Sequence, residues 1–213
     1  MNPDTFRTLS IVPTTCCAVP SKWKPLRECL LIFAAYLLLA LLFTYPLLFQ
    51  FTSHIPGVGG DAYQFYWNVW WTRHALVDLH ASPYFTHLLF HPSGVSLTHH
   101  TLSLMNGLIA LIPGLLFNTT IVFNSLVLFI LALAGVTMRL LCLHLGADPR
   151  AAFLGGILFA FSPFRMTRID AHLNILSLHF IPCSCSFSSN HSRHPVKTGN
   201  GFSPVVRHSP RPP

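Results

Sequence analysis

Residues 59–71 read GGDAYQFYWNVWW and hold three of the chain's four tryptophans and one of its six acidic residues. The two glycines permit a sharp turn, and Asp61 stands where a helix N-cap would stand. Aromatic residues then recur with the i, i+3, i+4, i+7 spacing of one helix face: Tyr63, Tyr66, Trp67 and Trp70. Tyrosine and tryptophan rings favour the lipid headgroup layer. We therefore predict an amphipathic interfacial helix that lies on a membrane surface and holds the Asp61 carboxylate there.

The composition is that of an integral membrane protein. Of the 213 residues, 52% are hydrophobic and only 9% are charged, whereas a soluble domain carries about 25% charged residues. The net charge is +7, but the basic residues form no run and no stacking pattern, so we expect no nucleic acid as a partner. Membrane topology explains the positive charge better, and membrane lipids are the expected surroundings.

Cysteine and histidine spacing predicts neither a metal nor a cofactor. The cysteines are Cys16, Cys17, Cys29, Cys142, Cys183 and Cys185. Adjacent and i, i+2 pairs suit neither a disulfide framework nor the C-x2-C spacing of zinc sites. His99 and His100 invite a metal interpretation, but no HExxH motif accompanies them. We predict no metal site.

The first long apolar run is residues 29–50, which is enough to cross about 30 Å of hydrocarbon at 1.5 Å per residue. Lys22, Lys24 and Arg27 precede it within the segment 1–28. Positive charge marks the cytoplasmic side, so we place 1–28 in the cytoplasm and residue 51 onward outside. The run does not end in small residues, as a cleaved signal peptide would, and we interpret it as a retained anchor.

Residues 29–182 predict an all-α, polytopic transmembrane domain. An outer loop over 51–101 carries the interfacial helix, and the later apolar segments are 102–117, 120–143, 151–164 and 169–182. The segment 102–117 either crosses the membrane or only dips into it, and counting the flanking arginines does not decide between these topologies. We expect a multi-pass protein of the cytoplasmic (inner) membrane.

The chain changes character after Pro182. Residues 183–213 contain no leucine, isoleucine, acidic residue, tyrosine or tryptophan. Such a segment buries no core, and we predict a disordered C-terminal tail. Because the change is abrupt, we hypothesise that the reading frame shifts near residue 182, which translation of the other two frames would test.

Asp61 is the candidate catalytic residue. A carboxylate at a membrane surface can act as a general base that takes a proton from an acceptor hydroxyl. The alternative is that Asp61 caps the helix by accepting the N–H groups of residues 63 or 64. The aromatic stripe likewise serves either as a platform for sugar rings and lipid tails or as an interfacial anchor.

Two basic clusters have similar alternatives. Arg73 and His74 could meet a phosphate or face lipid headgroups. Arg165, Arg168, Asp170 and His172 follow Pro163, and they either contact a phosphate group or mark a helix end at the interface.

Several short motifs occur in an order that resembles a known family. The outer loop holds Gly-Asp, then Gln-Phe-x-Trp-Asn-x-Trp-Trp, then His-Pro-Ser-Gly-x-Ser-Leu, and Phe123-Asn124-Ser125-Leu126 and Ala-Phe-Ser-Pro-Phe-Arg at 160–165 follow. Over residues 29–182 the chain resembles the N-terminal part of bacterial GT-C type integral membrane glycosyltransferases, the group of Rgt-like and ArnT-like enzymes.

The resemblance implies transfer of a sugar from a polyprenyl-phosphate donor to a lipid or glycan acceptor at the outer face of the cytoplasmic membrane. It places the catalytic base on Asp61, and we expect substrate binding at Trp67, Trp70, Arg73 and His91. Such enzymes have more spans, so we expect a truncated form, either active or inactive. The alternative is a non-enzymatic scaffold or assembly subunit that docks a partner through the outer loop. Transport is less favoured, because no predicted span carries a clear buried ionisable pair.

Overall fold

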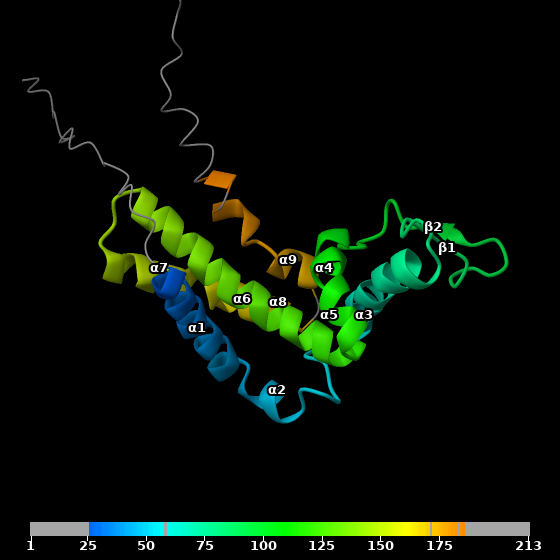
Figure 1. Cartoon of the computed structure of the whole chain (residues 1–213), viewed down its shortest axis with the longest axis horizontal. Coiled ribbons are helices and arrows are strands. Elements are labelled where there is room, and N and C mark those ends of the chain that lie inside the picture. Colours follow the sequence, from blue (N-terminus) through cyan, green and yellow to red (C-terminus); the bar gives the residue numbers. More distant parts are fainter. Residues whose placement is uncertain (1–25, 58, 171, 183, 186–213) are drawn as a thin grey trace, which may run out of the picture.

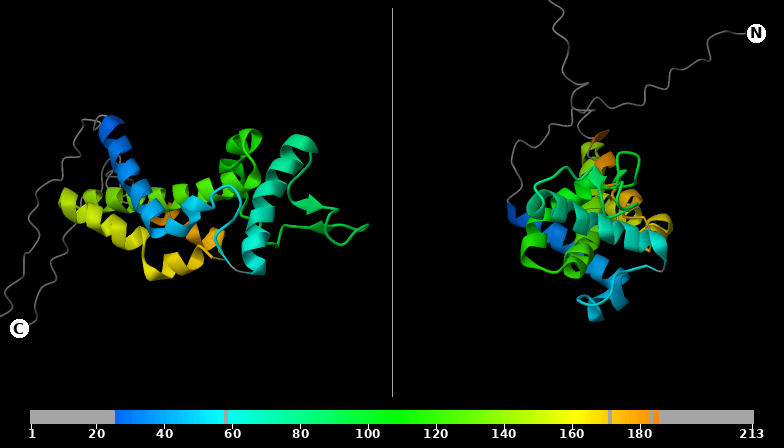
Figure 2. Two further views of the ribbon diagram at one scale, coloured as in Figure 1. Left: turned by 90° about the horizontal axis from the view of Figure 1, so that it is seen from below. Right: turned by 90° about the vertical axis from the view of Figure 1, so that its right-hand side faces the viewer.

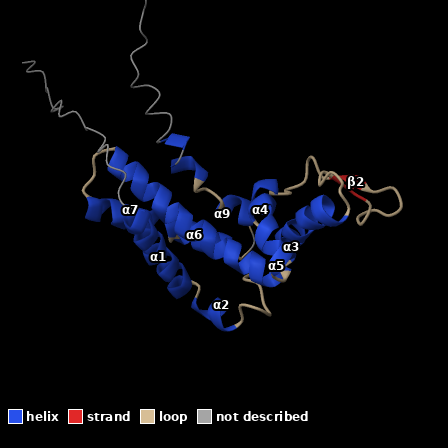
Figure 3. Ribbon diagram, viewed as in Figure 1, coloured by secondary structure: helices blue, strands red, loops and turns tan. Residues whose placement is uncertain are grey.

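The computed structural model describes residues 26–57, 59–170, 172–182 and 184–185. These residues are mostly helical, which confirms the all-α class (Figure 3). The helices are α1 (Leu26–Phe43), α2 (Tyr45–Phe49), α3 (Gly60–Arg73), the π-helical turn η1 (His74–Asp78), α4 (Leu104–Ile109), α5 (Leu111–Leu116), α6 (Thr119–His144), α7 (Pro149–Ala160), α8 (Pro163–Arg168) and α9 (Leu173–Leu176). The strands are β1 (Phe85–Thr86) and β2 (Val95–Ser96), paired antiparallel with Phe85 opposite Ser96. The predicted tail lies almost wholly outside the described residues, as does most of segment 1–28.

Helix α6 is the central element of the fold (Figure 1). Its first turn is capped by Asn118, whose side chain accepts a hydrogen bond from the Ile121 N–H at 2.9 Å. Its middle is fully buried at Ile130 and Leu131. Among the described residues, α6 is the one helix long and apolar enough to cross a membrane. The predicted segment 120–143 therefore coincides with a membrane-length helix.

Helices α1 and α7 pack on α6 around Tyr36, which is fully buried. The Tyr36 hydroxyl donates a hydrogen bond to the Phe153 carbonyl at 3.0 Å. Gly135 of α6 and Gly156 of α7 face the same ring, and a Cβ at either position would overlap the Tyr36 side chain. These glycines let the three helices approach closely.

The other predicted apolar segments are interrupted helices. The run 29–50 forms α1 and α2, which are separated at Thr44, whose hydroxyl donates to the Ala40 carbonyl at 2.7 Å. The segment 102–117 forms α4 and α5, which meet at Ala110, and 151–164 is broken before Pro163. The segment 169–182 contains the short helix α9 and turns. Their crossing of a membrane stays a prediction.

Helix α3 runs across the N-terminal end of α6 rather than along it (Figure 2). It buries Ala62, Phe65, Val69 and Thr72, and Phe65 and Val69 join the main apolar core. The predicted stripe is a different face: Tyr63 is 65% exposed, whereas Trp67 and Trp70 pack on a second cluster formed by Trp71, Ala75, Leu97 and Leu102. Tyr66 packs on the main core against Phe123, so the aromatic rings are divided among solvent, the main core and a small second cluster.

Three buried asparagine side chains tie this region to the helices. Asn124 of α6 donates to the carbonyls of Phe51 and His54, both at 2.8 Å. Asn68 of α3 donates to the Thr101 carbonyl at 2.7 Å, and the Asn106 side chain accepts from the Ser177 hydroxyl at 3.0 Å. Each bond satisfies a polar group that would otherwise be buried without a partner.

Candidate functional site

Asp61 lies in the first turn of α3, one residue inside the helix. The N-cap is Gly59, with φ +116°, and the helix end has no side-chain cap hydrogen bond. The expectation that Asp61 caps the helix is therefore wrong. Its carboxylate side chain is 61% exposed and lies 3.6 Å from Nε2 of His172. A carboxylate that is not used as a cap is available for chemistry.

The Asp61–His172 pair exists because two loops touch. Gly57 has φ +113°, and a Cβ there would overlap the carbonyl oxygen of Asp170. On the other side, the His172 N–H donates to the Arg168 carbonyl at 3.0 Å, which fixes the segment after α8. The close contact at Gly57 brings the start of α3 against the start of α9.

Helix α8, which precedes His172 in the chain, carries two arginines. Arg165 is 2% exposed, and none of its guanidinium nitrogens has a hydrogen-bond partner among the described residues. Arg165 lies 5.2 Å from the centre of the Phe159 ring, and Arg168 lies the same distance from the Phe164 ring. Burial lowers the pKa of Arg165 to about 10, so its guanidinium stays protonated at neutral pH. Arg165 is therefore a buried cation without a hydrogen-bonded partner among the described residues.

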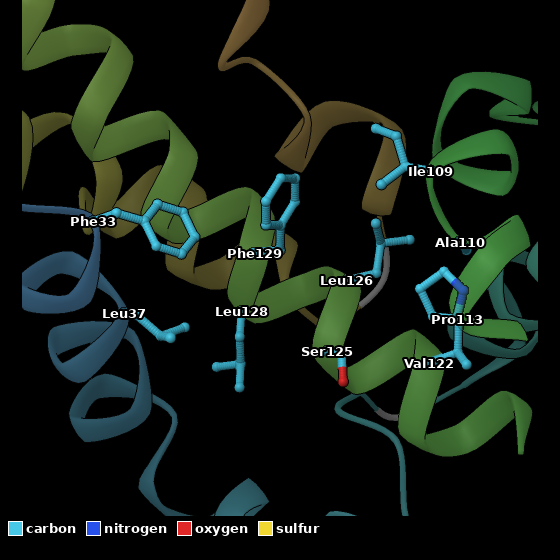
Figure 4. A pocket seen from close by; sticks show the side chains of 10 residues that line it. All are labelled: Phe33, Leu37, Ile109, Ala110, Pro113, Val122, Ser125, Leu126, Leu128 and Phe129. Atoms are coloured by element: carbon cyan, nitrogen blue, oxygen red, sulfur yellow. The ribbon is translucent and has the colours of Figure 1, made fainter. Parts of the chain in front are cut away.

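An apolar pocket of about 450 Å³ lies between α1, the α4–α5 turn and α6. Figure 4 shows Phe33 and Leu37 on the α1 side, Phe129 on α6, and Ile109 and Pro113 on the opposite side. The lining has one polar side chain, the hydroxyl of Ser125. We call this the tail pocket, because its chemistry suits a hydrocarbon chain.

The four predicted binding residues do not gather around Asp61. Arg73 is twelve residues further along α3, about 18 Å along the helix axis, and it forms an ion pair with Asp78 at 3.2 Å. Trp70 stacks on His74 with ring centres 4.8 Å apart, and Trp67 stacks on Trp71 at 5.6 Å.

His91 is exposed in the loop between β1 and β2, at the far end of the molecule from α7 (Figure 1). With His87 it has H-x3-H spacing, but this loop is not a helix. Among the described residues, no group of three or more His, Cys, Asp or Glu side chains could hold a metal ion.

His172 belongs to a polar cluster noted in the sequence, but it is not among the predicted catalytic or binding residues. The sequence places it in a cluster with Arg165, Arg168 and Asp170, whose signal is the spacing of polar residues after Ser162-Pro163. That spacing alone does not say which other segment these residues face.

Comparison with protein-family models, with curated proteins and with solved structures finds no match.

Proposed function

We propose that this chain is a glycosyltransferase-like protein of the cytoplasmic membrane that takes a sugar from a polyprenyl-phosphate donor at the outer face, with Asp61 as the general base. The observation that carries the proposal is the uncapped, exposed Asp61 carboxylate 3.6 Å from His172. A catalytic base must be reachable by substrate, and it must also be held in place by its neighbours. Asp61 meets both requirements.

In the proposed reaction an acceptor hydroxyl attacks the anomeric carbon of the donor sugar. The bond from that carbon to the phosphate oxygen breaks, and its electron pair stays on the lipid phosphate. The acceptor proton passes to the Asp61 carboxylate. His172, when protonated, holds the carboxylate by charge and limits its rotation.

In the proposed reaction, cationic side chains of the segment around His172 stabilise the leaving phosphate. The His172 N–H donates a hydrogen bond to the Arg168 carbonyl, so the two residues share one turn, and the His172 ring of that turn lies beside the Asp61 carboxylate. Preorganised cations that stabilise developing negative charge are usually the largest single contribution to such a reaction.

The tail pocket and α6 support the membrane part of the proposal. A polyprenyl chain is a hydrocarbon, and the tail pocket offers it an apolar surface on the membrane-length helix. We propose that α1 and the later apolar segments also lie in the membrane, so that the protein is multi-pass. Helix α3, lying across the end of α6, would then run along the outer surface.

An alternative is favoured by one observation, the exposed apolar residues of the β1–β2 hairpin. They are Tyr84, Phe85, Leu88, Leu89 and Phe90, the last of which is 78% exposed. Such a patch suits docking to a partner subunit. In that case the protein is a membrane scaffold and Asp61 is not needed.

Replacement of Asp61 by asparagine distinguishes these functions. The Asp61→Asn variant keeps the size of the side chain but removes the base, so we expect at least about a 100-fold loss of sugar transfer. The measurement is transfer from a panel of polyprenyl-phosphate-linked hexoses and pentoses in proteoliposomes.

Asp148→Asn is the matched control, because Asp148 caps α7 through the Arg150 N–H at 2.8 Å and asparagine caps equally well. Both variants should insert and melt like the wild type. Equal transfer by Asp61→Asn and Asp148→Asn would remove the catalytic role and leave the scaffold.

A further inference from the structure

A second cavity, of about 350 Å³, lies between the end of α1, α2, the segment 50–57 and α8. We call it the loop cavity. Gly57 and Asp170 both line it, and these are the residues whose contact holds the start of α3 against the segment before α9. The loop cavity is therefore next to the Asp61–His172 pair, although it contains neither side chain.

The lining of the loop cavity combines a larger apolar part with a smaller polar part. Phe43, Leu47 and Met166 give it apolar surface, whereas Gln50, His54 and Asp170 give it hydrogen-bonding groups. A sugar ring has the same division, with C–H faces and an edge of hydroxyls. A carboxylate accepts hydrogen bonds from hydroxyls, and an amide both donates and accepts them.

Other ligands fit this lining less well. A hydrocarbon chain would leave the polar groups unpaired, which costs free energy. The Asp170 carboxylate repels an inorganic anion. A divalent cation prefers several carboxylate or imidazole ligands, and only Asp170 and His54 offer these here.

The walls of the loop cavity are held in place before any ligand binds. Asn124 fixes the segment 51–54 through two hydrogen bonds of 2.8 Å. Phe43 stacks on Phe161 with ring centres 4.7 Å apart and an interplanar angle of 13°. A preformed site loses little conformational freedom on binding, so weak polar contacts suffice for recognition.

We infer that the loop cavity binds a single sugar ring, with Asp170 and Gln50 recognising its hydroxyls. The inference rests on the proposed function, because nearness to Asp61 is what gives a sugar there a chemical purpose. The volume is at the small end of the range for ligand pockets, about 300–1,000 Å³. That size suits one ring better than an oligosaccharide.

Saturation-transfer NMR on the full chain in lipid nanodiscs tests the inference. The probes are the methyl glycosides of glucose, galactose, mannose and arabinose. We expect transfer to at least one glycoside, and at least tenfold weaker binding of it by Asp170→Asn and by Gln50→Ala. Binding by Asp148→Asn, a change at the remote N-cap of α7, should equal that of the wild type.

Two further arms identify the source of the sugar. Tighter binding of glucose 1-phosphate than of methyl glucoside marks a donor sugar, and equal binding marks an acceptor sugar; either supports the inference. No transfer to any glycoside, equal binding by Asp170→Asn and the wild type, or a signal that EDTA abolishes would overturn it. Sugar binding together with unchanged turnover in Asp61→Asn would instead remove the proposed function alone.

Discussion

Gly57 and Gly59 both have left-handed backbone angles, φ +113° and +116°, but only Gly57 is crowded. Alanine at either position adds backbone strain. At residue 57 its Cβ would also meet the Asp170 carbonyl, whereas at residue 59 nothing lies within 4 Å. We therefore expect Gly57→Ala to separate Asp61 from His172 and Gly59→Ala to leave them together.

Crosslinking measures this separation. In a cysteine-free background, Asp61→Cys and His172→Cys are joined by a short bifunctional thiol reagent, and the yield is compared with each alanine added. A clearly lower yield for Gly57→Ala is the expected result. Equal crosslinking yields with Gly57→Ala and with Gly59→Ala would show that the contact between Gly57 and Asp170 does not position the pair.

Sequence reasoning at this scale found Asp61 but gave it the wrong alternative role. A Gly-Gly-Asp sequence before an aromatic helix fits an aspartate N-cap, and no local rule shows that the helix begins at Gly60 instead. His172 was within reach as a member of a charged cluster. Its contact with Asp61 depends on a tertiary approach of two loops, which residue spacing does not encode.

At the scale of elements, adjacent glycines of α7 test the packing around Tyr36. A Cβ on Gly156 would overlap the Tyr36 hydroxyl and lie 2.6 Å from the Gly135 carbonyl oxygen, whereas a Cβ on Gly155 would lie 3.1 Å from Sγ of Cys142. We expect Gly156→Ala to lower the free energy of unfolding by about 1–3 kcal/mol and Gly155→Ala to change it much less. Unfolding in mixed detergent micelles measures both. Equal losses would mean that α7 does not depend on the Tyr36 contact.

Contacts in the turn η1 predict that the structure around the C-terminal end of α3 depends on pH. A hydrogen bond with His74, and then the charge of Arg73, hold the pKa of Asp78 below its usual value of 3.8. A depressed folded-state pKa contributes stability above 3.8, and this contribution is lost as pH falls through the folded value.

Near-UV circular dichroism of the stacked tryptophans should therefore be steady from pH 7 to about 5 and change only below about 4. In Asp78→Asn this carboxylate transition should be missing. A transition that stays in the variant would assign it to another group.

The sequence predicts the bounds of a helix best where the apolar run is long and unbroken. The predicted range 120–143 and the helix Thr119–His144 differ by only one residue at each end. The ends are marked in the sequence, since a capping asparagine precedes the helix and Gly146, with φ +92°, follows it. The aromatic helix was also predicted, but its buried face was not. Residue spacing shows which aromatic rings share a face of the helix, but it does not show which face is buried. Helices α4, α5 and α6 cover the face of α3 that carries Ala62, Phe65, Val69 and Thr72.

For the whole molecule, the proposed orientation puts the two ends of α6 on opposite sides of the membrane. Helix α6 has 26 residues, about 39 Å of helix against about 30 Å of hydrocarbon. The hairpin lies beyond its N-terminal end and Asp148 just beyond its C-terminal end.

In a cysteine-free background, His91→Cys should react with a membrane-impermeant maleimide from the outside of spheroplasts, and Asp148→Cys only after lysis. Labelling of both positions from outside would show that α6 does not cross. Tyr63→Cys, at an exposed site on α3, should behave like His91→Cys.

Composition predicted the helical class of the molecule but not its long-range contacts. The Tyr36–Phe153 and Gly57–Asp170 contacts join segments that are far apart in the chain. Hydrophobic periodicity identifies which residues avoid water, and it leaves open which helices they pair with.

The asparagine bonds described above also bear on what happens if the chain is cut. Asn124 secures the polypeptide at Phe51 and His54, and Asn68 secures it again at Thr101. In the chain, the loop that joins β1 and β2 lies between Asn68 and Thr101. In space, this loop projects away from the helices. A protease nick there would yield two fragments that remain associated without a covalent link, so this loop is the natural place to split the protein for complementation or to insert a reporter domain.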